Sequence, residues 1–422
     1  MWSWNRCSTI RMTKTKSSVT RTSGDATVAG PRRCFPCSGV PGHEVPLAVI
    51  DQIFAGPVDV VSLAELEAAQ HSRRLLLLKA VLESGDADYR GAWRTLVAAQ
   101  QRDRCAVRAI LMYPSVGTWL VRALRAARSA LREEVPTNSY LSSVAAAASI
   151  RTGLDATLDV PAWHGRVTLP TIGQAGPVGD GSREFVPLGE LCFDSGEKWW
   201  PLRRHRSTEG EHSVLWTIDD LDPYREFGDV RPPARLDSGE FADWCGLLDE
   251  AWRILVSRHR AYAAELAAIR PVIVPVPPGR GIVASSSFSA FGAMMVAPHQ
   301  SAVSLAETLI HEVQHSKLNA LLNLVPLEHD ESGRRYRAPW RRDPRPLAGL
   351  LHGIYAFTAV VEFWAAEQRS RTGLRRTAER EFADHLEQVR EAVLTARSAD
   401  ELTEFGRRFL DAVDRRLSAF PG

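Results

Sequence analysis

The chain has 422 residues, of which 45% are hydrophobic and 24% are charged, a composition that is ordinary for a soluble globular protein with room for two or three domains. The formal net charge of +2 is too small to indicate a nucleic-acid partner, and the basic residues are interspersed with acidic ones. No apolar run approaches the roughly 18 residues that cross a bilayer, and the N-terminus lacks the apolar centre of a signal peptide. The six cysteines are too scattered for a disulfide framework. We therefore expect a cytoplasmic protein that binds neither nucleic acid nor membrane.

The first part of the chain divides into a tail and a helical region. Residues 1–44 are rich in Ser, Thr, Arg and Gly and show no hydrophobic period, so we expect a disordered tail. Cys34 and Cys37 lack companion Cys or His residues at metal-binding spacing, which argues against a zinc knuckle. Residues 45–157 show helical periodicity, with a capping box expected over 62–65. They predict a helical N-terminal domain that serves as a scaffold or recognises a partner.

Residues 158–235 change to short alternating runs broken by Gly and Pro. We expect a middle region of small strands, over 165–169, 184–193 and 212–218. Three histidines in this region lack mutual metal-ligand spacing, so solvated or hydrogen-bonded roles are favoured for His164, His205 and His212.

Residues 236–422 form the last predicted domain. Asp237 opens a capped helix that continues toward Ile269 with a break near His259. Two strand-like stretches follow, over 272–276 and 281–296, and the second is unusually rich in small residues. Such a strand, just before a metal-binding helix, could accommodate an extended peptide along its edge or could pack tightly under the helix.

An H-E-x-x-H motif, formed by His311, Glu312 and His315, is the feature that most directly indicates a chemistry. Residues four apart share one face of a helix, so both histidines can offer nitrogens to one metal ion. A capping box over 304–307 is expected to start this helix, and Pro326 to end it. The apolar flanks favour a buried metal helix over a surface helix with two chance histidines.

A usable metal centre needs a third ligand from an element packed against the first helix. A second helix is expected from Pro346, and it carries His352 between Gly349 and Gly353, which would let two helix backbones approach closely. His352 is the preferred third ligand. Glu362, further along the same helix, is the alternative and would otherwise support a ligand from behind. Helices over 373–397 and 400–417 would complete the helical wall.

The motif leaves the metal open. With zinc, Glu312 would activate a bound water and the protein would be an HExxH metallopeptidase. With Fe(II), the same helix would supply part of a three-ligand face with open positions for a 2-oxo acid and dioxygen. A peptide-binding scaffold with a degenerate site is disfavoured because both histidines of the motif are intact.

The residues after the motif resemble a known family. The run 311–322, the A-P-W-R-x-D-P-R-P loop within 336–347 and the segment 349–353 resemble the HExxH-type Fe(II)/2-oxoglutarate-dependent peptide β-hydroxylases. That family also resembles a C-terminal domain of some radical SAM maturases of ribosomal peptides. The resemblance extends over about 219–364, and motif and loop together are far more specific than the motif alone. It implies an enzyme that uses Fe(II), 2-oxoglutarate and dioxygen to hydroxylate the β-carbon of residues in a precursor peptide.

The resemblance makes His311 and His315 iron ligands and suggests a radical SAM maturase as a further partner. The distal carboxylate of 2-oxoglutarate would suit an arginine fork, for which Arg345 or Arg341 is the candidate, although both could instead tie their loop together through Asp343. Lys317 should point away from the metal face. Glu312 would orient a ligand or water, since a hydroxylase needs no such base.

The predicted fold class is α+β and predominantly helical. We expect the metal-binding helix to pack on the second ligand helix beside a small sheet. The N-terminal helical domain would help to hold the precursor peptide.

Overall fold

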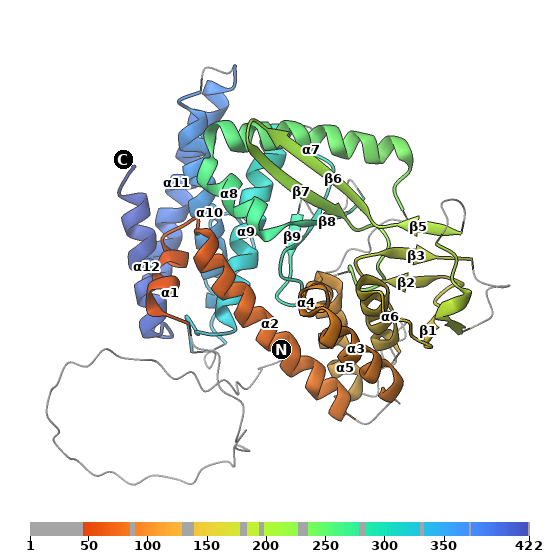
Figure 1. The fold of residues 1–422 in the computed structure, drawn as a ribbon. Coiled ribbons are helices and arrows are strands. Elements are labelled where there is room, and N and C mark those ends of the chain that lie inside the picture. The colour runs from red at the N-terminus through yellow and green to blue at the C-terminus, as the bar shows by residue number, and fades with distance from the viewer. Residues whose placement is uncertain are drawn as a thin grey trace, which may run out of the picture.

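The computed structural model describes residues 45–84, 89–128, 139–177, 184–193, 198–226, 235–277, 284–299, 301–329, 333–370 and 373–420. Within these ranges the fold is α+β and predominantly helical, with twelve α-helices and three small sheets (Figure 1). The predicted fold class is therefore confirmed. The expected tail over 1–44, with Cys34 and Cys37, lies outside the described residues.

Six helices make up the N-terminal part: α1 (Leu47–Phe54), α2 (Val60–Glu83), α3 (Arg90–Arg102), α4 (Arg104–Leu111), α5 (Pro114–Arg128) and α6 (Tyr140–Thr152). Helix α2 is capped by Asp59, whose carboxylate accepts a hydrogen bond from the backbone N–H of Ser62 at 2.8 Å. The capping box expected to start at Ser62 is wrong, because the aspartate one turn earlier takes the cap and Ser62 becomes its donor.

Two of the sheets are small. One pairs β1 (Asp159–Pro161) with β4 (Phe185–Pro187), which leads into a short 3-10 helix at Leu188–Glu190. The other contains β2 (Val167–Leu169), β3 (Gly173–Ala175) and β5 (Trp199–Pro201).

The third sheet has five strands in the order β6-β7-β8-β10-β9. They are β6 (Arg203–Glu209), β7 (His212–Ile218), β8 (Val272–Pro275), β9 (Ala284–Ser286) and β10 (Ala293–Val296). Strands β7, β8 and β10 run parallel, whereas β6 and β9 are antiparallel to their neighbours. The predicted boundary at residue 235 therefore falls inside one sheet, which joins strands from both sides of it.

The remaining helices are α7 (Ser238–Arg258), α8 (Arg260–Ile269), α9 (Ala302–Leu322), α10 (Leu347–Glu367), α11 (Arg375–Arg397) and α12 (Glu404–Leu417). The capping box at Asp237 and the break at His259 are both confirmed. Helix α9 starts earlier than expected, because Ser301 caps it and accepts from the backbone N–H of Ser304 at 3.2 Å. The predicted cap at Ser304 is therefore wrong by one turn.

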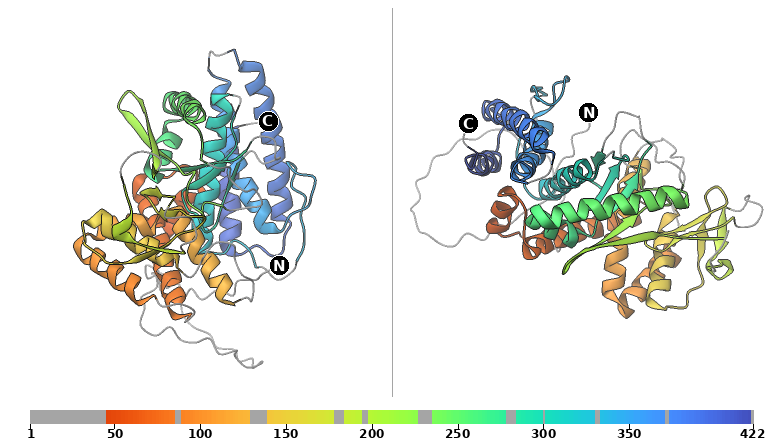
Figure 2. Two further views of the ribbon diagram at one scale, coloured as in Figure 1. Left: turned by 90° about the vertical axis from the view of Figure 1, so that its right-hand side faces the viewer. Right: turned by 90° about the horizontal axis from the view of Figure 1, so that it is seen from above.

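The central strands separate two hydrophobic cores. Ile273 and Met294 face the core built from α1, α7, α9, α10 and α12, whereas Val274 and Met295 face the core built from α3 to α6. This alternation is the period of two that a strand buried on both faces requires. Figure 2 shows the two groups of helices on opposite sides of the molecule.

Helices α1 and α2 do not follow the predicted boundaries at residues 44 and 157. Helix α1 packs on α12, at the other end of the chain (Figure 1). Helix α2 contributes Leu63 and Leu66 to the first core and Leu78 and Val81 to the second. Part of the predicted N-terminal domain thus belongs to the core that contains the H-E-x-x-H motif.

By length and composition alone, helix α10 could cross a membrane. The sequence was expected to contain no such segment. However, 72% of its most apolar stretch is buried in the protein, where it packs against α9 and α11. The core helix of a folded domain has this character.

Candidate metal centre

Three histidines from two packed helices come together in the first core. His311 and His315 lie on one face of α9, and their Nε2 atoms are 3.0 Å apart. His352 of α10 lies beside His315, with 5.6 Å between the ring centroids. The structure therefore brings the two motif histidines and the preferred third ligand to the same place.

The histidines have the chemistry that a transition-metal ion requires. Two nitrogens that each lie about 2.1 Å from one ion are roughly 3.0 to 3.4 Å apart, so His311 and His315 fit a shared ion. Burial lowers the pKa of His311 and of His352 to about 4. Burial and the two neighbouring histidines lower the pKa of His315 well below its usual range. All three imidazoles are neutral at pH 7 and keep a lone pair for a metal.

The ring of His352 lies near the pair formed by His311 and His315 but does not complete a three-ligand site with them as the side chains stand. In the described part of the chain, no three His, Cys, Asp or Glu side chains are arranged so that they could hold a metal ion as they stand. His311 and His315 form the preset pair, and the ring of His352 is tilted by 32° to that of His315. The residue types fit a metal centre, and its completion depends on His352.

Glu362, the alternative third ligand, is engaged elsewhere. Its two carboxylate oxygens accept from the Arg416 guanidinium at 2.8 and 3.0 Å, and Tyr262 donates its hydroxyl to the same carboxylate. Because an ion pair and a phenol occupy this carboxylate, the structure favours His352 as the third ligand.

Glu312 projects from α9 toward the sheet. The residue is only 4% exposed, and its carboxyl lies near the side chain of Ser286 in β9. Its Oε2 atom is buried without a hydrogen-bond partner among the described residues. Burial raises the pKa of Glu312 to about 7, and the nearby Ser286 side chain offsets part of that effect. This carboxyl can therefore hold or release a proton near neutral pH.

The loop after α9 holds the two arginines predicted to bind a cosubstrate. Arg341 contacts the Asp343 carboxylate at 3.1 and 3.3 Å, and Arg345 lies 3.5 Å from it. All three side chains are well exposed. Both arginines thus contact Asp343 within their own loop. This is the structural role that the sequence analysis gave as the alternative to binding 2-oxoglutarate.

The glycines around His352 have a different role from the predicted one. A Cβ atom on Gly353 would lie 2.1 Å from the indole of Trp340, so this glycine makes room for that ring rather than for a second helix backbone. Trp340 in turn packs on Phe357, with 4.8 Å between ring centroids. The A-P-W-R loop is therefore fastened against α10 directly beside the histidines.

Phe357 and His385 are site residues that sequence reasoning missed. The Phe357 ring lies 4.9 Å from His311 and is stacked 5.3 Å from His385 of α11. His385 also lies 4.0 Å from Glu307, one helical turn before His311. The spacing of Glu307, His311 and His315 indicates a shared helix face, but nothing local to His385 indicates that it joins them.

Lys317 points away from the metal face, as its spacing predicts. It is fully buried, and its Nζ donates to Glu265 at 2.6 Å and to the carbonyl of Gly56 at 2.8 Å. Gln314 donates to the same glutamate at 3.1 Å. This buried polar cluster joins the side of α9 opposite the histidines to α8 and to the connection between α1 and α2.

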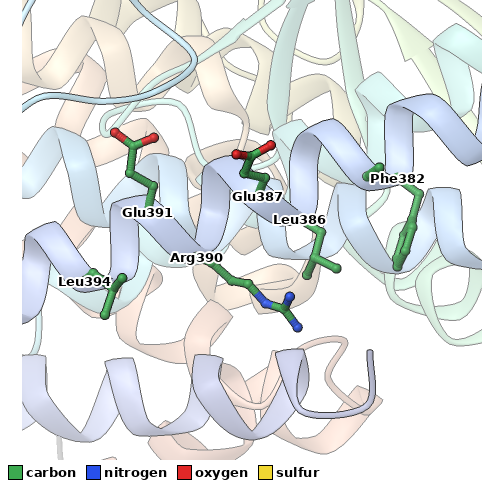
Figure 3. Close-up of a pocket in the computed structure, with 7 residues that line it drawn as sticks. Phe382, Leu386, Glu387, Arg390, Glu391 and Leu394 are labelled. Carbon is green, nitrogen blue, oxygen red and sulfur yellow. The ribbon is translucent and has the colours of Figure 1, made fainter. Parts of the chain in front are cut away.

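A surface pocket of about 600 Å³ lies on α11, where Figure 3 shows residues that line it: Phe382, Leu386, Glu387, Arg390, Glu391 and Leu394. Glu387 and Glu391 project from one side of the helix, and Arg390 and Leu386 from the other. No histidine lines this pocket. It is therefore separate from the histidine cluster.

Comparison with known proteins does not extend these observations. No protein-family model matches the sequence, and no curated protein matches it significantly.

Proposed function

We propose that the protein is an oxygenase that uses Fe(II), 2-oxoglutarate and dioxygen to hydroxylate the β-carbon of residues in a ribosomally made precursor peptide. The observation that carries the proposal is the partly buried set of neutral histidines formed by His311, His315 and His352. The resemblance of the motif and its following loop to the HExxH-type peptide β-hydroxylases favours iron over zinc.

Different residues of the chain would bind the metal, exclude water and position a ligand. His311, His315 and His352 would hold the iron, which when bound supplies the oxidising chemistry that couples conversion of the 2-oxo acid to succinate and carbon dioxide with hydroxylation. Phe357 and Trp340 cover the α10 side of His311 and would exclude water there. Glu312 would position a water or ligand through its unpartnered Oε2 atom.

A peptide substrate suits the sheet edge beside the motif. Strand β9 is the last strand of the sheet within the described residues, and it contacts α9. Its residues, Ala284, Ser285 and Ser286, are small and half-buried, so an extended chain could lie along this edge without meeting bulky side chains. Peptides commonly bind proteins by adding a strand to such an edge.

A zinc-dependent HExxH metallopeptidase is the second candidate, and Glu312 is the observation that favours it. A buried carboxyl whose pKa is raised to about 7 by burial suits a general base that accepts a proton from water. Glu312 also stands at the position of the motif that carries the general base in H-E-x-x-H peptidases.

Mass spectrometry of a candidate precursor peptide separates the two functions. The peptide is taken from a short reading frame beside the gene and incubated with protein loaded anaerobically with Fe(II), then with 2-oxoglutarate and dioxygen. Gain of one oxygen with release of succinate supports the oxygenase. Cleavage fragments with zinc alone would sink it in favour of the peptidase. An unchanged biological product in His311→Ala would leave only a scaffold role.

The metal centre has a test that does not need turnover. Bound iron per chain, measured by elemental analysis, is expected to fall strongly in His311→Ala and in His352→Ala. The matched control is His212→Ala, because His212 is exposed on β7. If His352→Ala retained full iron and Glu362→Ala lost it, the assignment of the third ligand would be reversed.

A further inference from the structure

Helix α11 has one buried face and one exposed face. Its buried residues, among them Leu386 and Val389, belong to the first core, where the helix packs on α10 and α12 at the edge of the molecule (Figure 2). The residues that line the surface pocket of about 600 Å³ all belong to α11. One of them, Leu394, is 71% exposed. Exposed charges by themselves are typical of a solvated helix face, so their arrangement must decide whether this face has a partner.

Six exposed residues form a stripe along α11. They are three or four positions apart, so on a helix of 3.6 residues per turn they lie within about 80° of one another. The two arginines of the stripe stand in its N-terminal half and the two glutamates in its C-terminal half. In chain order, the α11 stripe consists of Arg376, Arg380, Ala383, Glu387, Glu391 and Leu394.

This order of charges makes the α11 stripe complementary to itself. When two copies of the helix run antiparallel about a two-fold axis between residues 383 and 384, residues equally far from that point face each other. Arg380 then faces Glu387 of the second copy, and Arg376 faces Glu391. An isologous interface repeats each contact by symmetry, so both pairs of opposite charge occur twice. No like charges of the stripe face each other in this arrangement.

The apolar residues of the stripe fit the same arrangement. Ala383 stands at the centre, where a small side chain lets two helices approach closely. Leu394 would lie opposite the start of the second copy's helix, where Leu374 is 40% exposed. The two large hydrophobic residues that are exposed at the ends of α11 would thus meet each other.

The charged residues of the stripe are available for these contacts. The ion pairs within α11 join Arg375 to Glu379 and Arg380 to Glu381, and among the described residues neither Arg376 nor Glu387 takes part in one. Glu391 lies 3.8 Å from an exposed arginine of the loop between α9 and α10. Exposed ion pairs contribute little to stability, so Arg380 and Glu391 can exchange their present partners at small cost.

We propose that α11 is a homodimer interface, in which two copies of the chain pair antiparallel about Ala383. The charges favour a second copy over the chain's own N-terminal segment. Residues 1–44 contain seven Lys or Arg and two Asp or Glu, so they would suit the acidic half of the stripe but not its basic half. The proposal is independent of the reaction proposed for the metal centre.

Sedimentation equilibrium of the full-length chain over a range of concentrations tests the interface. The wild type is expected to approach twice the mass of one chain. Arg380→Glu and Glu387→Arg should each raise the dissociation constant of the dimer by about tenfold or more, because each places like charges opposite each other twice. Both changes in one chain restore opposite charges, so the double variant should dimerise like the wild type. The matched control is Arg253→Glu, an exposed arginine of α7.

A mixture of the two single variants provides the sharpest test. Chains with Arg380→Glu and chains with Glu387→Arg should form a mixed dimer more tightly than either variant pairs with itself, because every facing charge is then opposite. The inference is overturned by a wild type that stays monomeric at every concentration, or by single variants that dimerise as well as the wild type. If neither the double variant nor the mixture recovers the dimer, the stripe contacts a different segment, such as residues 1–44, and the inference is likewise overturned.

Discussion

At the scale of single residues, the geometry of the candidate metal centre depends on side chains outside the H-E-x-x-H motif as well as on the motif. Phe357 touches His311 and His385, and Trp340 occupies the space above Gly353. These aromatic contacts fix the face of α10 that carries His352. Small changes in this packing should therefore reach the ligands.

Gly353→Ala tests that packing. The added Cβ would lie 2.1 Å from Trp340, so we expect the indole to shift and stability to fall by about 1 to 3 kcal/mol. Gly349→Ala is the control, because its Cβ would meet the Cβ of Arg345 at 3.4 Å, and alanine favours a helix interior by up to about 1 kcal/mol. Urea unfolding of both variants gives the measurement. Equal stabilities would show that Trp340 does not occupy this position.

Glu265→Gln tests the buried pair on the other side of α9. Both Glu265 and Lys317 are fully buried, so neutralising the acid leaves an ammonium without its counter-charge. We expect a loss of about 3 to 5 kcal/mol in the free energy of unfolding. The double variant Glu265→Gln, Lys317→Met should recover part of it, because no charge then remains unpaired. A double variant less stable than the sum of the two single changes would argue against the pair.

At the scale of elements, the segment after β7 ties the sheet to the N-terminal helices. Asp219 accepts from the Tyr113 hydroxyl at 2.6 Å, and Asp222 accepts from the Tyr140 hydroxyl at 2.5 Å. Both carboxylates are buried. Two buried carboxyl groups thus connect the segment after β7 to the turn between α4 and α5 and to α6.

This connection should make stability depend on pH. Burial, and then the charge of Asp219, raise the pKa of Asp222 from 3.8 to about 7. The folded chain then binds a proton that the unfolded chain releases, so stability from this group is greatest below about pH 4 and is lost as pH rises toward 7. Asp222→Asn should flatten that part of the profile of unfolding temperature. Asp155→Asn, an exposed control, should not; an unchanged slope in Asp222→Asn would refute the assignment.

The sequence predicted well those features that depend only on neighbouring residues. The H-E-x-x-H spacing, the cap at Asp237 and the break at His259 are properties of neighbouring residues, and the structure has the last two as expected. The caps of α2 and α9 were misplaced because two polar residues one turn apart competed for each. His385 was missed because Phe357 and Glu307, which it contacts, are distant from it in the sequence, and hydrophobic periodicity does not report such contacts.

At the scale of the whole molecule, segments that are far apart in the sequence pack in the same hydrophobic core. Helix α1 lies against α12, where Phe54 makes an edge contact with Phe409 at 5.3 Å between ring centroids. The Tyr355 hydroxyl of α10 donates to the carbonyl of Ile53. The beginning and the end of the described chain therefore stabilise the same core.

Phe54→Ala should loosen that core selectively. The ring is fully buried, so its removal is expected to cost about 3 to 5 kcal/mol. Hydrogen exchange followed by mass spectrometry should then accelerate in α10 and α12 more than in α3 and α6, which belong to the other core. Equal acceleration in all four helices would show that the two cores unfold as one.

The path of α2 through both cores has a consequence for the stability of the molecule. Leu66 packs in the core that contains the H-E-x-x-H helix, whereas Leu78 packs in the core of the N-terminal helices. Because one continuous helix enters both cores, local unfolding of α2 in one half is opposed by its packing in the other half.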